Sequence, residues 1–323
     1  MGKVYIKEID ALKGIAIFLV VLGHSIIVYP IDLHQNVICN NIYIWLSSFH
    51  MPLLFFISGF CFSYRESYKE FIKKKIFRIL IPYLFFNAID IIPRALFPSL
   101  VNRDRGIEES IKYIIFYGGE YWFLYDLFII FLIYPLIAKY TRNTVYRQII
   151  VILTIVLLHF TLPSIHIFNL SKVIYNMLFF SVGILIKEMF GDRIFNIKID
   201  KKITISTMIS LLILWRFLIK LNILCRYVDI ICALVGIITT FLCIQSEIIT
   251  TVFARFGKYS LQLYLLNGYL LVISRTIIVT VFKIYSPVII ICFNMMFDFF
   301  ASYFMIKYLC EKNRVIRTVM GIV

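Results

Sequence analysis

The sequence predicts an all-α, polytopic integral membrane protein with about ten transmembrane helices and both termini in the cytoplasm. Three observations lead to this fold class. Hydrophobic residues make up 61% of the 323 residues and charged residues only 16%, so the chain lacks the polar surface of a soluble domain of this size. Long apolar runs recur along the chain, and Lys and Arg gather in alternate segments between them. We expect residues 1–323 to form a single membrane-embedded domain.

The expected membrane spans follow from the apolar runs. A helix needs about 20 mainly apolar residues to cross a bilayer. The third and fifth runs are the weakest, because Pro82 and Pro93 interrupt the third and the fifth is short. The expected spans are 11–29, 43–63, 79–97, 122–138, 149–163, 173–190, 203–221, 228–245, 259–282 and 287–308.

Basic residues set the expected orientation. They cluster before the first run and after every second run, as in Lys69 to Arg78, and the intervening segments carry fewer of them. The positive-inside rule therefore places both termini in the cytoplasm. The same distribution explains the net charge of +15 through contact with lipid headgroups, so no nucleic-acid partner is expected. The longest outer segment is 98–121, and we expect its apolar stretch 111–117 to form an interfacial helix.

Cysteine spacing gives no sign of a metal site. None of the seven cysteines forms a CxxC pair, and most lie inside apolar runs. Small apolar packing residues are the simplest interpretation. We expect neither a bound metal nor a permanently bound cofactor.

A few ionisable residues fall inside the expected spans. Each costs at least about 2.5–3.5 kcal/mol at membrane depth, which makes it a candidate functional residue. These residues are Lys13, His24, His50, Asp90, Asp126, Arg216, Arg275 and Asp298.

The first expected helix carries a cation and an imidazole on one face. Lys13 and His24 are eleven residues apart, which brings them within about 20° of each other and separates them by about 16 Å along the axis. Asp10 is placed as the N-cap of this helix. Lys13 could instead be a topology anchor that extends to the membrane surface, and His24 could be a hydrogen-bonded structural histidine.

His50 and Asp126 lie at a depth similar to that of His24, counted from the outer ends of their helices. A carboxylate beside a histidine fixes the tautomer of the ring and stabilises the imidazolium, which would make a general base. Alternatively, Asp126 forms a structural ion pair with Arg216 or Arg275. Trp122 and its neighbouring tyrosines are typical of an interfacial aromatic belt.

A basic cluster precedes the third expected helix. Lys75 and Arg78 stand three residues apart, and on a continuous helix they would share a face. Such a pair at the cytoplasmic mouth could bind phosphates. Topology anchoring explains the neighbouring Lys73 and Lys74 without any ligand.

Several motifs, taken in order, resemble the membrane acyltransferase-3 family. Lys13 and Gly23-His24, with the ten-residue gap between the two ionisable residues, are similar to its first helix. The segment from Phe49-His50-Met51-Pro52 to Ser58-Gly59-Phe60 is similar to its second helix, and Lys75 with Arg78 to its basic pair before the third. Trp122-Phe123-Leu124 and the stretch Gly257 to Leu266 match two later patterns. The resemblance covers the whole chain.

The resemblance implies a ten-helix enzyme that takes an acyl group, usually acetyl, from cytoplasmic acyl-CoA to a hydroxyl of an envelope sugar. It implies that His24 is the catalytic base, that Lys13 is its basic partner, and that Lys75 and Arg78 contact CoA. Lys13 and Lys75 stand where many members carry Arg, so bidentate hydrogen bonding is lost. Asn267 stands where many members carry His.

Together, these observations favour a membrane O-acyltransferase, most of all an O-acetyltransferase, in the bacterial cytoplasmic membrane. The expected co-substrate is acetyl-CoA or another acyl-CoA, and the acceptor is an envelope glycan or lipid-linked sugar. We expect His50, Glu120, Trp122 and Asp126 to bind the acceptor. The alternative is a transporter or flippase for lipid-linked sugars, and a third hypothesis is a scaffold for envelope synthesis.

Overall fold

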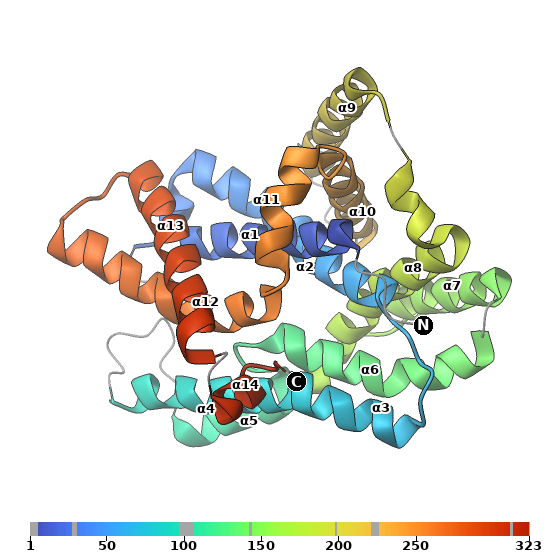
Figure 1. Cartoon of the computed structure of the whole chain (residues 1–323), viewed down its shortest axis with the longest axis horizontal. Coiled ribbons are helices and arrows are strands. Elements are labelled where there is room, and N and C mark those ends of the chain that lie inside the picture. The colour runs from blue at the N-terminus through green and yellow to red at the C-terminus, as the bar shows by residue number, and fades with distance from the viewer. Residues whose placement is uncertain are drawn as a thin grey trace.

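The computed structural model describes residues 6–27, 31–96, 106–141, 144–197, 199–220, 226–310 and 313–322. These residues form helices and no strand, as expected. Figure 1 shows their arrangement. The helices are α1 (Lys7–Ile27), α2 (Val37–Phe60), α3 (Tyr68–Lys75), α4 (Ile81–Leu96), α5 (Ile107–Tyr117), α6 (Trp122–Thr141), α7 (Val145–Thr161), α8 (Leu170–Phe190), α9 (Lys201–Lys220), α10 (Arg226–Cys243), α11 (Glu247–Gly257), α12 (Ser260–Thr276), α13 (Pro287–Met305) and α14 (Arg314–Val319).

Six helical stretches of the described residues are long and apolar enough to cross a membrane. They contain α1, α2, α6, α8, α12 and α13, and each coincides with an expected span. A seventh is counted if α10 and α11 form one span, although the chain bends by 110° between them. The protein is thus a multi-pass membrane protein by the length and composition of its helices.

The remaining three expected spans are helical but do not meet the same criteria. Helices α4 and α7 have only 16 and 17 residues. Helix α9 has 20 residues but includes the charged residues Lys201, Lys202 and Arg216. The count of ten spans and the cytoplasmic placement of the termini therefore stay predictions.

The expected outer segment 98–121 is described only in part, because residues 98–105 lie outside the described ranges. Its apolar stretch is helical, as α5, and covers α4 and α6. The Tyr83 hydroxyl of α4 donates to the carbonyl of Ile114 at 2.6 Å, and the Tyr125 hydroxyl of α6 donates to that of Ile115 at 2.8 Å. These bonds fix the first turns of α4 and α6 to α5.

Helix α1 lies at the centre of the helix assembly (Figure 1). It packs against α2, α11, α12 and α13. Its contact with α11 depends on two glycines: a Cβ at Gly14 would collide with the carbonyl of Phe253, and a Cβ at Gly257 with that of Asp10. Small residues of this kind let helix backbones approach closely in membranes. The helix that carries Lys13 and His24 is therefore held on several sides.

Candidate active site

The two intramembrane histidines lie close together where α1 meets α2. His24 and His50 are within range of direct electrostatic interaction, and both side chains are partly buried. A Cβ at Gly23 would lie 4.0 Å from the side chain of Leu46, so the backbone beside His24 faces the turn of α2 that precedes His50. The expectation that the two histidines share a layer agrees with this arrangement.

The hydrogen bonding of the two rings differs. His50 Nδ1 lies 2.5 Å from the carbonyl oxygen of Leu46. A carbonyl can only accept a hydrogen bond, so Nδ1 carries a proton and the neutral ring keeps its lone pair on Nε2. Among the described residues, no hydrogen bond to the His24 ring is recorded. Within the described ranges, the nitrogens of His24 are therefore not engaged by a side chain or a carbonyl.

Arg275 of α12 holds the end of α1 that carries His24. Its side chain is fully buried, and its guanidinium donates to the carbonyl of Ile31 at 2.6 Å and to that of Ser25. Ser25 follows His24 in the last turn of α1, where carbonyls lack an intrahelical partner and carry partial negative charge. A buried cation from another helix thus fixes the backbone next to the imidazole.

Lys13 lies at the opposite end of α1 and pairs with Asp10. Its Nζ is 3.2 Å from Asp10 Oδ1, and the two side chains are 31% and 14% exposed. The prediction that Asp10 is the N-cap is wrong, because the helix already begins at Lys7 and Asp10 lies inside its first turn. The Lys13 cation therefore forms an ion pair with a carboxylate and stays partly accessible to solvent.

A π-helical turn separates the two predicted CoA contacts. Residues Ile76–Leu80 form this turn between α3 and α4, and its larger number of residues per turn changes the direction of the side chains in and after it. Lys75 Nζ lies 3.9 Å from the centre of the Phe131 ring and 5.0 Å from that of Phe71. Arg78 is exposed. The expected shared face is therefore not formed, and Arg78 is the more accessible of the two cations.

The predicted basic residues nevertheless gather at one end of the protein. Gly257, at the end of α11, abuts the backbone of the first turn of α1. A few residues further on, the side chain of Leu261 borders Gly321, which also abuts the backbone carbonyl of Arg78. The junction between α11 and α12 therefore links the Lys13 end of α1 to the start of α4, and His24 lies at the far end of α1.

Asp126 of α6 is bound by α8 and not by a histidine. The carboxylate is fully buried and accepts hydrogen bonds from Asn169 Nδ2 at 3.2 Å and Asn176 Nδ2 at 3.1 Å. Lys172 also interacts with it electrostatically. Lys172 and Asn176 lie four residues apart on one side of α8, and Asn169 immediately precedes that helix. Asp126 thus belongs to a separate polar cluster.

Neither pairing that the sequence left open for Asp126 forms. Arg216 donates to Asn41 Oδ1 at 3.5 Å, and Arg275 binds the end of α1. Within the described ranges, the other recorded interactions of Asp126 involve tyrosines of α4, α6 and α12. The structure brings His24 to His50 and does not bring either to this carboxylate.

A glycine turn presents Glu120 and Trp122 beside the Asp126 cluster. Gly118 and Gly119 have φ values of +84° and +58°, which other residues adopt only with strain. The backbone N–H of Glu120 donates to Asn87 Oδ1 at 3.1 Å, and its side chain is exposed. Lys172 Nζ lies 5.3 Å from the centre of the Trp122 ring. Lys172 therefore links Trp122 to Asp126, and Glu120 precedes them in the same turn.

Sequence reasoning missed the α8 members of this group. Asn169 carries additional strain, with φ at +51° just before the helix, which is typical of functional sites. A signal was present, because Asn169, Lys172 and Asn176 interrupt an apolar run at the spacing of one helical face.

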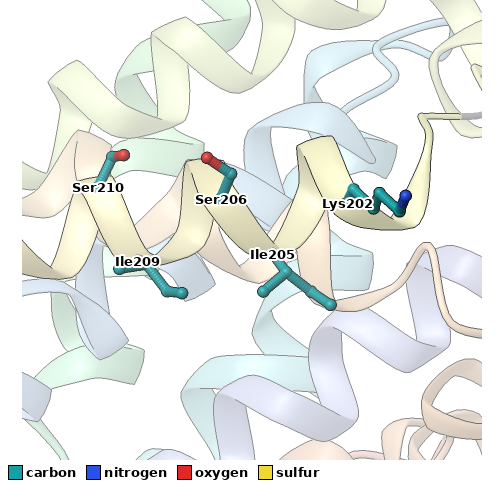
Figure 2. A pocket seen from close by; sticks show the side chains of 5 residues that line it. All are labelled: Lys202, Ile205, Ser206, Ile209 and Ser210. Carbon is teal, nitrogen blue, oxygen red and sulfur yellow. The ribbon is translucent and has the colours of Figure 1, made fainter.

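A surface hollow lies elsewhere, on α9. Lys202, Ile205, Ser206, Ile209 and Ser210 line it, and all of them belong to α9 (Figure 2). It contains none of the predicted site residues. Because a single helix supplies its whole lining, it cannot enclose a substrate.

Comparison with known proteins places the chain among acyltransferases. A family model described as an acyltransferase domain matches residues 6–307. The nodulation protein NolL of Sinorhizobium fredii is 30% identical over 196 residues, which cover 57% of this chain and 49% of that protein. NolL of Mesorhizobium japonicum is 28% identical over 149 residues, 42% of this chain and 37% of that protein. The chain thus matches about half or less of the length of these relatives. No solved structure matches it.

Proposed function

Because the chain belongs to the acyltransferase-3 family, we propose that it is a membrane O-acyltransferase that uses acyl-CoA. Acetyl-CoA is the favoured donor. The acceptor is a hydroxyl of a cell-envelope sugar or polysaccharide, and the enzyme resides in the bacterial cytoplasmic membrane. The observation that carries this proposal is the setting of His24. Its ring has no recorded hydrogen bond among the described residues, stands beside His50, and sits next to a backbone that Arg275 holds.

In the proposed reaction, His24 accepts the proton of the sugar hydroxyl as its oxygen attacks the thioester carbonyl. The tetrahedral intermediate then collapses, the carbon–sulfur bond breaks, and the proton passes from His24 to the departing CoA thiolate. The products are the sugar ester and CoA with its thiol restored. A positioned general base of this kind contributes about 10²–10⁴-fold in rate.

The donor reaches His24 from the basic end of α1. In this proposal, Lys13, Lys75 and Arg78 attract the CoA phosphates. Arg78 is exposed and contacts the phosphates directly. Lys75 lies over the Phe131 ring and attracts the phosphates mainly by long-range electrostatic interaction.

In this proposal, the acceptor binds near Glu120, Trp122 and Asp126. Lys172, Asn169 and Asn176 join this group because they bind Asp126 or lie over Trp122. An indole ring with charged and amide groups around it is well suited to a sugar, which presents both an apolar face and hydroxyls. His50 then contacts the reacting hydroxyl through its Nε2.

The test is an envelope analysis of the producing bacterium. Deletion of the gene should remove one acyl mass, 42 Da for acetyl, from an envelope glycan measured by mass spectrometry. The unaltered gene should restore this mass, and His24→Gln should not, although the variant should insert at a normal level. His166→Gln, a change at an exposed histidine, should restore it fully. An unchanged glycan in the deletion strain would refute the proposal and favour the transporter alternative.

A further inference from the structure

Helix α13 carries buried polar side chains whose hydrogen-bonding atoms lack partners in the described part of the protein. Asn294, Asp298 and Ser302 follow one another at intervals of four and are fully buried. Within the described ranges, Asn294 Nδ2, both carboxylate oxygens of Asp298, and Ser302 Oγ have no hydrogen-bond partner. On α12, Asn267 adds an unpartnered, buried Oδ1. We name these four residues the polar stripe.

Unpartnered polar atoms are costly in any interior and more so at membrane depth. A carboxylate in this state is retained where a ligand completes its hydrogen bonds. The function proposed above does not use the polar stripe, so its ligand has to be identified from its position and chemistry.

The outer end of the polar stripe lies level with His24. The hydroxyl of Ser274 donates to Asn294 Oδ1 at 2.8 Å. The next residue, Arg275, donates to the carbonyl of Ser25, which follows His24. Asn294 and the imidazole are therefore at the same depth, on helices that both contact α12.

The stripe then continues along α1 toward the Lys13 end. The ring of Phe18 stacks on that of Phe299 with their centres 5.9 Å apart, which puts Asp298 level with the middle of α1. Helices α12 and α13 lie side by side (Figure 1). Asn267 and Ser302 are seven and eight residues from the Ser274–Asn294 contact, so both lie about 10–12 Å further toward the basic end.

We propose that the polar stripe binds the pantetheine arm of the acyl-CoA donor, an inference that rests on the proposed function. The arm is uncharged and carries two amides and a hydroxyl, with a two-carbon spacer between the amides. Each step along the stripe rises about 6 Å, so successive side chains meet successive polar groups. Asn294 donates to an amide carbonyl, Asp298 accepts from an amide N–H, and Ser302 and Asn267 bind the hydroxyl.

The charge of the polar stripe favours this part of the donor over the nucleotide end. Asp298 is its only ionisable residue, and a carboxylate repels phosphates. The CoA phosphates therefore stay at the basic end, and the arm runs along the polar stripe to bring the thioester level with His24.

The experiment compares CoA with a nucleotide that lacks the arm and the phosphate attached to it. Protein in lipid nanodiscs is titrated calorimetrically with CoA and with adenosine 3′,5′-bisphosphate, which lacks pantetheine. Asp298→Leu and Asn294→Leu should each raise the Kd of CoA about tenfold, the usual effect of losing a hydrogen bond or two, and leave that of the bisphosphate unchanged. Phe300→Leu, a change on the exposed side of α13, should alter neither.

Thermal unfolding gives a second readout that a structural role would not produce. Because Asp298 has no hydrogen-bond partner among the described residues, Asp298→Leu should keep or raise the Tm of the ligand-free protein and reduce the Tm increase that CoA causes. Wild-type affinity for CoA in both Leu variants would overturn the inference, and so would a lower Tm of ligand-free Asp298→Leu. If Asp298→Leu does not fold, the Kd values of CoA and of the bisphosphate are compared in Ser302→Ala and Asn294→Leu instead, with the same expected results. A wild-type protein that binds no CoA would instead refute the proposed function.

Discussion

The buried guanidinium of Arg275 donates a hydrogen bond to the backbone carbonyl of Ser25, the residue that follows His24. The same side chain also holds the carbonyl of Ile31. One cation from α12 therefore closes the end of α1 and restrains the turn that carries the proposed base. Sequence alone presents Arg275 as a costly charge at membrane depth, and this contact explains why the charge is retained.

Arg275→Gln should lower kcat more than it changes the Kd of CoA, because the CoA phosphates bind at the far end of α1 while the base loses its support. Loss of hydrogen bonds from a charged donor also costs about 1.5–3 kcal/mol of stability each. Arg275→Lys keeps one donor and should restore part of kcat. Steady-state kinetics and CoA titration check this, and an equal loss of CoA affinity would show general unfolding instead.

Replacement of Asp126 should affect the acceptor and spare the donor. Asp126→Asn offers one oxygen where Asn169 and Asn176 each bind a separate carboxylate oxygen. We expect the KM of the glycan acceptor to rise about tenfold, the loss of one charge-assisted hydrogen bond, while the KM of acetyl-CoA stays constant. Glu108→Gln on the exposed surface of α5 is the matched control. A selective effect on acetyl-CoA would contradict this assignment.

Arg78 and Lys75 should respond differently to substitution, because only Arg78 is exposed. Arg78→Gln should raise the KM of acetyl-CoA several-fold at low salt, and the effect should shrink as ionic strength rises, because salt screens exposed charges. Lys73→Gln, in the same basic cluster, should have little effect. Lys75→Met should mainly lower stability through loss of the contact with the Phe131 ring. A larger KM effect in Lys75→Met than in Arg78→Gln would reverse these roles.

The contact between α1 and α11 should be intolerant of side chains. A Cβ at Gly257 would collide with the carbonyl of Asp10, so Gly257→Ala should cost about 1–3 kcal/mol as the helices separate. Gly268→Ala is the control, because its Cβ meets nothing within 4 Å, and it should be neutral or stabilising by about 0.5–1 kcal/mol. Thermal unfolding in detergent measures both, and equal Tm values would argue against the close approach.

Hydropathy was enough to locate the main helices, because each span is a local property of the chain. Counting residues from the expected outer ends of the first two helices was likewise enough to place His24 and His50 at a similar depth. The partners of Asp126 could not be predicted, because they depend on how α6 and α8 rotate against each other. The π-helical turn at Ile76–Leu80 breaks the regular spacing on which the pairing of Lys75 with Arg78 relied. Similarly, the number of apolar residues in α10 and α11 does not reveal the bend of 110° after α10.

The most direct test of the central claim is transfer of labelled acetyl from acetyl-CoA by purified protein, with envelope glycan extract as acceptor. The account predicts glycan labelling by the wild type and a decrease of about 10²–10⁴-fold in His24→Gln, with CoA affinity retained. Wild-type protein that transfers no label, or His24→Gln that transfers it at the wild-type rate, would contradict the account.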